Sequence, residues 1–153
     1  MADSTEIVIG DPDGQHLLIR ALARTHPGLF DYPDGDWIVC EVEIAAGGFR
    51  GRFRANLRSE EFQAFLEEVA GLSTTLEGRA AFSTMEGQIE FSLTGDATGR
   101  IGVEGEALDE AETGNRLHFA FEMDPAHLPE ISRALASVLA AFPVTGRASE
   151  SAS

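Results

Sequence analysis

Cysteine, histidine and serine are the side chains of this sequence that could act as nucleophiles, bases or metal ligands. Its only cysteine, Cys40, lies in an apolar alternation between Val39 and Glu41, which predicts a buried thiol. No serine lies in a Gly-x-Ser-x-Gly turn, and the glycine-rich segment 99–102 has no helix after it to bind phosphate. No two of the four histidines have the short spacing of a metal site, so we expect no catalytic residue, no metal and no cofactor. The histidines are His16, His26, His118 and His127.

The net charge of the chain limits the kinds of molecule that it can bind. Its 26 Asp and Glu residues outnumber 11 basic residues, all of them Arg, so the formal net charge is −15. The acidic residues are spread along the sequence, and a field of this sign repels nucleic acid and anionic membranes. We therefore expect a basic protein partner, no nucleic acid and no membrane. The alternative is that the acidity only keeps the protein soluble.

Two acidic loops are the candidate partner-binding surface. The first lies within 24–36 and is long for a compact domain, which favours a functional surface. It combines aromatic and acidic side chains, a mixture suited to a basic protein surface, and a second acidic loop spans 108–113. The alternative is that both are ordinary acidic loops. The candidate residues are Phe30, Asp31, Tyr32, Asp34, Asp36, Asp109, Glu110 and Glu112.

The chain is organised around a strand that runs directly into a helix, within 48–72. Phe49, Phe53 and Leu57 alternate with polar residues, mostly arginines, which is typical of a strand with one buried face. From Ser59, a natural N-cap, apolar residues recur at helical spacing. The helical stripe consists of Phe62, Phe65, Leu66, Val69 and Leu72.

A hairpin partner for the arginine strand begins at Trp37. A two-residue turn at 46–47 would place Glu43 opposite Arg50 and Glu41 opposite Arg52, with apolar residues sharing the other face. We therefore interpret the arginines as a paired outer face and not as an anion-binding stripe.

The other segments predict more strands and a second helix. A strand at 117–123 leads into a helix with Asp124 as its cap and Pro125 in its first position, while Pro129 predicts an irregular turn. Segment 114–138 thus parallels 48–72, either as an internal duplication or as two units with the same physical needs. The other expected strands span 6–10, 16–22, 75–82, 88–93 and 100–106.

Together these segments predict an α+β fold: a mostly antiparallel β-sheet of about six to eight strands with two helices packed on one face. We expect one domain over 1–144 and a disordered C-terminal tail over 145–153. The absence of a signal peptide and of a long apolar run predicts a cytoplasmic protein. The charged face away from the helices is expected to carry Arg50, Arg52, Glu90, Arg116, His118 and Glu122.

Three segments carry a resemblance: the Trp-led strand DWIVCEVEI, the helix FQAFLEEVAGL and the Asp-capped helix DPAHLPEISRAL. Over residues 6–142 this layout resembles the WapI-type immunity proteins and related small uncharacterised bacterial families. The resemblance implies a non-enzymatic protein that binds and neutralises a bacterial toxin domain, commonly a nuclease. The alternatives are a self-associating structural module, and a small-ligand binder or enzyme. The oligomeric state stays open, a homodimer included.

Overall fold

The computed structural model describes residues 5–25, 36–96 and 98–144, which form eight strands and two helices. The predicted α+β class is confirmed, and the predicted tail lies outside the described residues. In chain order the elements are β1 (Glu6–Gly10), β2 (His16–Arg24), β3 (Trp37–Ala46), β4 (Phe49–Arg58), α1 (Ser59–Thr75), β5 (Glu77–Phe82), β6 (Ile89–Asp96), β7 (Ile101–Leu108), β8 (Arg116–Met123) and α2 (His127–Ala141).

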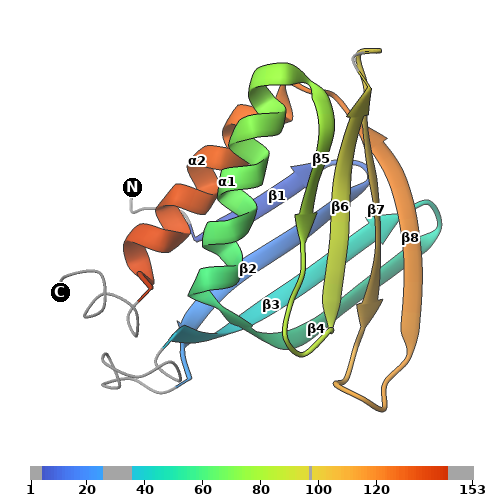
Figure 1. The fold of residues 1–153 in the computed structure, drawn as a ribbon. Coiled ribbons are helices and arrows are strands. Elements are labelled where there is room, and N and C mark those ends of the chain that lie inside the picture. The colour runs from blue at the N-terminus through green and yellow to red at the C-terminus, as the bar shows by residue number, and fades with distance from the viewer. Residues whose placement is uncertain (1–4, 26–35, 97, 145–153) are drawn as a thin grey trace, which may run out of the picture.

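The strands form two four-stranded antiparallel sheets instead of the single sheet expected. Each is a meander in chain order, with consecutive strands paired antiparallel, and α1 separates β4 from β5. We refer to β1–β4 as sheet A and to β5–β8 as sheet B. In Figure 1 sheet B lies across sheet A, and the two helices run side by side next to β5 and over β1. A four-stranded meander followed by a helix thus occurs twice, in line with the parallel between 48–72 and 114–138.

One hydrophobic core lies between the two sheets and the helices. Phe62 and Phe65 of α1 contact Phe82 of β5 with ring centroids 5.5 and 5.4 Å apart. Phe65 also meets Phe91 of β6 edge to face at 5.3 Å, an arrangement that aromatic rings favour. The helical stripe predicted for α1 is buried here, with Leu66 half-buried, so these aromatic contacts hold α1 against sheet B.

The β3–β4 hairpin turns at residues 47–48, one residue later than predicted. Gly47 has a φ of 59°, in the left-handed region that glycine adopts at low cost. The later turn shifts the pairing by two residues, so that Glu43 lies opposite Arg52 instead of Arg50. The predicted register is therefore wrong, but a shift of two keeps each side chain on its predicted face.

The start of α1 also differs from the prediction. Ser59 is its first residue, and Arg58 occupies the N-cap position with extended backbone angles. The carboxylate of Glu61 accepts the backbone N–H of Arg58 at 2.9 Å. Glu61 thus satisfies a backbone donor at this helix end, as in a capping box.

The second helix begins at His127, two residues after the predicted start at Pro125. Pro129 therefore lies in the first turn, where backbone N–H groups have no partner within the helix. The chain enters α2 through i→i−3 hydrogen bonds, from the His127 N–H to the Asp124 carbonyl at 3.1 Å and from the Leu128 N–H to the Pro125 carbonyl at 3.0 Å, an irregular turn in line with the prediction. No helix in the described part of the chain is long and apolar enough to cross a membrane.

Two buried polar side chains join parts of the fold that are distant in sequence. Glu61 accepts the backbone N–H of Met85 at 2.8 Å and so ties α1 to the β5–β6 connection. Gln88 donates from Nε2 to the carbonyl oxygens of Arg54 and Leu108, both at 3.1 Å. The Gln88 amide thereby links β4 of sheet A to β7 of sheet B and fixes one sheet relative to the other.

Candidate functional site

The first of the two predicted acidic loops is described only at its end. Phe30, Asp31, Tyr32 and Asp34 lie outside the described residues. Asp36 is fully buried at 0% exposure, and its carbonyl oxygen accepts the hydroxyl of Ser59 at 3.3 Å. The structure therefore places Asp36 beneath the surface, at the start of α1.

The second predicted loop connects β7 to β8 at one end of sheet B. The carboxylate of Asp109 accepts the backbone N–H of Asn115 at 2.7 Å, so it shapes the loop itself. Glu110 and Glu112 are exposed. Three of the predicted site residues, all acidic, therefore lie together in this loop, beside the exposed face of sheet B.

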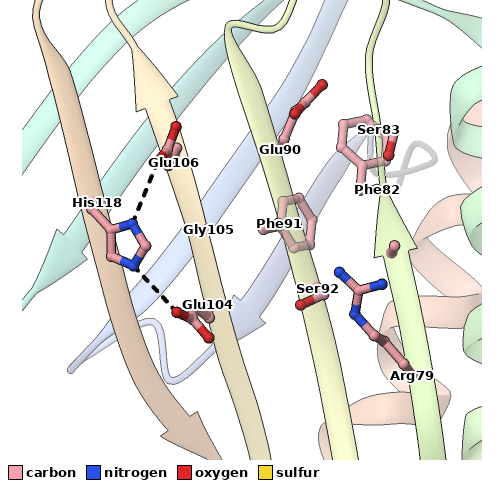
Figure 2. A pocket seen from close by; sticks show the side chains of 11 residues that line it. Arg79, Phe82, Ser83, Glu90, Phe91, Ser92, Glu104, Gly105, Glu106 and His118 are labelled. Carbon is pink, nitrogen blue, oxygen red and sulfur yellow. Dashed lines mark hydrogen bonds and ion pairs between the residues drawn. The ribbon is translucent and has the colours of Figure 1, made fainter.

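A hollow of about 290 Å³ lies on the exposed face of sheet B. Figure 2 shows its charged side chains, which come from all four strands. The residues between them are small, among them Ala81, Ser92 and Gly105. We call this feature the sheet B hollow. Its charged residues are Arg79, Glu90, Glu104, Glu106 and His118.

His118 is held between two carboxylates on the neighbouring strand. Its Nε2 lies 3.2 Å from Oε2 of Glu104, and its Nδ1 lies 3.6 Å from Oε2 of Glu106. The side chains of His118 and Glu104 are 59% and 66% exposed. Solvent therefore reaches this cluster, and among the residues that line the hollow three carboxylates outnumber the single guanidinium, that of Arg79.

Two carboxylates of the hollow face each other across neighbouring strands. The register places Glu90 of β6 directly opposite Glu106 of β7. Side chains in this position have Cβ atoms about 4.5–5.5 Å apart, and like charges there are destabilising. Arg116 compensates Glu106 at 3.0 Å, whereas within the described part of the chain the carboxylate of Glu90 has neither an ion pair nor a hydrogen bond. The hollow thus keeps an uncompensated charge.

Gly105 faces the core side of β7, beneath the hollow. In the register it lies between Phe91 and Phe119, which point into the core. A Cβ atom on Gly105 would lie 2.3 Å from the backbone oxygen of Glu90 and 2.5 Å from the Cβ of Phe91. The missing side chain therefore allows the close contact between β6 and β7 beneath the carboxylates.

The exposed face of sheet A has paired charges instead. Arg20 of β2 donates from Nε to Glu6 at 2.7 Å and from Nη1 to Glu41 at 2.5 Å. The hydrogen bond to Glu6 raises the pKa of Arg20 above its usual value. Glu41 lies opposite Arg54 in the register, so the predicted pair of Glu41 with Arg52 is replaced by the pair with Arg20.

Glu43 is the second centre of charge pairing on sheet A. It accepts His16 Nε2 at 3.0 Å and Arg52 Nη2 at 3.2 Å. The hydrogen bond from His16 lowers the pKa of the Glu43 carboxyl, and Arg52 acts in the same direction. Sheet A thus neutralises its own carboxylates to a degree that sheet B does not.

The residues that could do chemistry are not gathered into a reactive site. Cys40 is buried as predicted, and burial together with the charge of Glu61 raises the pKa of its thiol to about 12. Across the described residues, no group of three or more His, Cys, Asp or Glu side chains is placed to hold a metal ion. Of the histidines, only His118 lies in the sheet B hollow; His26 lies outside the described residues.

Residues 8–143 match the model of the immunity protein WapI-like family, which is nearly the whole described chain. The chain belongs to this family. The resemblance inferred from the sequence segments is confirmed. No curated protein matches the chain.

Two solved structures share parts of the architecture of this immunity-family chain. One is MRP1/MRP2 from Trypanosoma bruciei, with 13% identity, a TM-score of 0.48, and coverage of 91% of this chain and 84% of that one. The other is a CdiA-CT/CdiI toxin and immunity complex from Enterobacter cloacae, with 11% identity, a TM-score of 0.41, and coverage of 65% and 88%. At these scores neither likeness bears on partner or mechanism.

Part of the sheet B hollow was visible in the sequence. Glu90, Arg116, His118 and Glu122 were expected to share an outer face, and they do share the exposed face of sheet B. Arg50 and Arg52, expected on the same face, lie on sheet A. Sequence reasoning missed Arg79, Glu104 and Glu106 as members of one cluster, although their outward positions and the small residues between them were a usable signal.

Proposed function

We propose that this protein is an immunity protein that binds a cognate bacterial toxin domain and neutralises it by direct contact, without catalysis. The observation that carries this proposal is the match to the WapI-like immunity family over residues 8–143. The partner is a basic domain, because a net charge of −15 repels acidic and phosphate-bearing molecules and accelerates association with basic ones.

A nuclease domain is the toxin class that this charge fits best. Domains that bind nucleic acid neutralise its phosphates with Lys and Arg side chains, so their active clefts are basic. An acidic protein seated on such a cleft competes with the nucleic acid for the same cations. The toxin is then neutralised because its cleft is occupied, and no chemical step is needed.

The acidic loop between β7 and β8 fits the same proposal. Asp109, Glu110 and Glu112 lie in an exposed loop next to the acidic face of sheet B. Exposed charges at the rim of an interface mainly accelerate association. We assign this loop to steering of the partner, and the predicted residues within 30–34 to the same role.

Co-expression in cells tests the proposed function. The toxin to test is the C-terminal domain of a large toxin gene, if one ends directly upstream of the gene for this protein. We expect its expression alone to stop growth, and co-expression of this protein to restore growth and yield a complex that elutes as one species. An unrelated protein of similar size and negative charge serves as the control and should not protect. Growth arrest in the presence of abundant folded protein would contradict the proposal.

A further inference from the structure

We propose that the sheet B hollow is the surface that docks the toxin domain, with an Arg or Lys side chain of the toxin seated between Glu90 and Glu104. This inference rests on the proposed immunity function and adds the binding surface to it. The carboxylates come from β6 and β7, so a cation seated here would contact two strands of the rigid sheet.

The charge arrangement favours a cationic partner group. Glu90 lies opposite Glu106, and only Glu106 is compensated by a guanidinium, that of Arg116. Glu104 contacts His118, which carries a positive charge only when protonated. A guanidinium or ammonium group from outside would relieve the repulsion between Glu90 and Glu106, and would make charge-assisted hydrogen bonds to Glu90 and Glu104.

The pairing of carboxylates on the two sheets favours the exposed face of sheet B as the docking surface. On sheet A the carboxylates of Glu41 and Glu43 already accept hydrogen bonds from Arg20, His16 and Arg52. A partner cation there would have to displace an existing pair. On sheet B the carboxylate of Glu90 has no such internal donor among the described residues. Sheet B therefore gains more from an external cation.

The shape of the hollow favours a protein side chain over a free small molecule. Its volume of about 290 Å³ is at the lower limit of the roughly 300–1,000 Å³ of small-molecule sites. The side chains of Glu104, Glu106 and His118 are 46–66% exposed, so they cannot enclose a ligand as such sites do. A side chain carried by a docked protein surface is enclosed by both partners together.

Three matched double variants test the docking surface. Glu90→Gln with Glu104→Gln removes two charges from the hollow, Glu110→Gln with Glu112→Gln removes two from the loop, and Glu67→Gln with Glu130→Gln removes two from the helices. Each keeps the shape of the side chains and changes the net charge equally. Differences in toxin binding among them then report on position and not on total charge.

We expect the hollow variant to dissociate from the purified toxin domain about tenfold faster or more, as when a contact in the centre of an interface is lost. Its unfolding midpoint should stay unchanged or rise, because the repulsion between Glu90 and Glu106 disappears. The helix variant should dissociate within about twofold of the wild-type rate. Suppose that the wild type binds the toxin domain and protects cells, and that the hollow variant dissociates at the wild-type rate. This result would overturn the docking surface and leave the proposed function intact.

Two further outcomes would speak against the toxin as the occupant of the sheet B hollow. If the wild-type protein neither binds the toxin domain nor protects cells, the proposed function fails and the docking surface fails with it. Light scattering of the free protein tests a second copy as the occupant. If the wild type is a dimer and the hollow variant is a monomer, the toxin-docking assignment is overturned. The same mass for the wild type and the hollow variant supports it.

Discussion

Glu43 accepts hydrogen bonds from two neighbouring strands, from His16 of β2 and from Arg52 of β4. Because these bonds favour the ionised form, the pKa of Glu43 is lower in the folded chain than its ordinary value of 4.5. Its contribution to stability is therefore present above that ordinary value and is lost as the pH falls through the lower, folded value.

The substitution Glu43→Gln tests this contribution. We expect it to reduce the free energy of unfolding at pH 7 by about 0.5–1 kcal/mol, since the site is partly exposed. The difference from the wild type should disappear at low pH, where Glu43 is protonated in the wild type as well. Denaturant unfolding at both pH values measures it, with the exposed Glu67→Gln as the matched control. Equal destabilisation at pH 7 and at low pH would show that the charge of Glu43 plays no part.

The sequence predicted individual residues well where periodicity decides their position, and poorly elsewhere. Cys40 and the apolar stripe of α1 are buried as alternation and helical spacing indicate. Phe49 follows the same alternation but is 67% exposed, because its position next to the hairpin turn lies beyond the cover of the core. Asp36 looked like a loop residue, but it is buried, and its carbonyl oxygen accepts the hydroxyl of Ser59, which is distant in sequence.

At the scale of elements, the β7–β8 loop carries the second group of predicted binding residues. We expect Glu110→Gln with Glu112→Gln to lower the association rate with the toxin domain by about two- to fivefold at low ionic strength. The difference should vanish at high salt, where exposed charges are screened, and the dissociation rate should not change. Surface plasmon resonance over a salt series measures both rates. A faster dissociation without slower association would place this loop inside the interface instead.

The elements themselves were largely predictable, and their arrangement was not. Hairpin connections and the change from period two to helical spacing are local signals, so the strands, both helices and the antiparallel pairing follow from the sequence. The division into two sheets depends on which strands fail to pair, and no local pattern encodes that. The β3–β4 register depended on choosing between two adjacent turns, and the two glycines at 47–48 decided it.

The sheet B hollow was hidden for the same reason. Glu90, Glu104 and His118 are far apart along the chain, and only the registers of β6, β7 and β8 bring them together. Their outward alternation was visible, but moving a turn by one residue shifts the register by two, which is enough to change which charges face each other. Gly105, which allows the close strand contact, looked like an ordinary strand glycine in the sequence.

At the scale of the whole molecule, two sheets with different charge arrangements cover one core. On sheet A the carboxylates of Glu6, Glu41 and Glu43 are all paired internally. On sheet B Glu106 and Glu122 are paired with Arg116 and Arg100, while the carboxylate of Glu90 has no partner among the described residues. The net charge of −15 surrounds both. We propose that these features serve neutralisation of a basic toxin domain by occupancy, with long-range attraction from the whole chain and local contacts from one sheet face.

Titration of the purified toxin domain with this protein tests that account most directly. If neutralisation is occupancy, toxin activity should fall linearly with added protein and reach zero at an equimolar amount, at concentrations far above the dissociation constant. The molar ratio of protein to toxin at which activity reaches zero should not change with incubation time, because the protein does not turn over the toxin as a substrate. Loss of toxin activity at a small fraction of an equivalent would reveal a catalytic mechanism, and undiminished activity at excess protein would show that this chain does not neutralise the toxin.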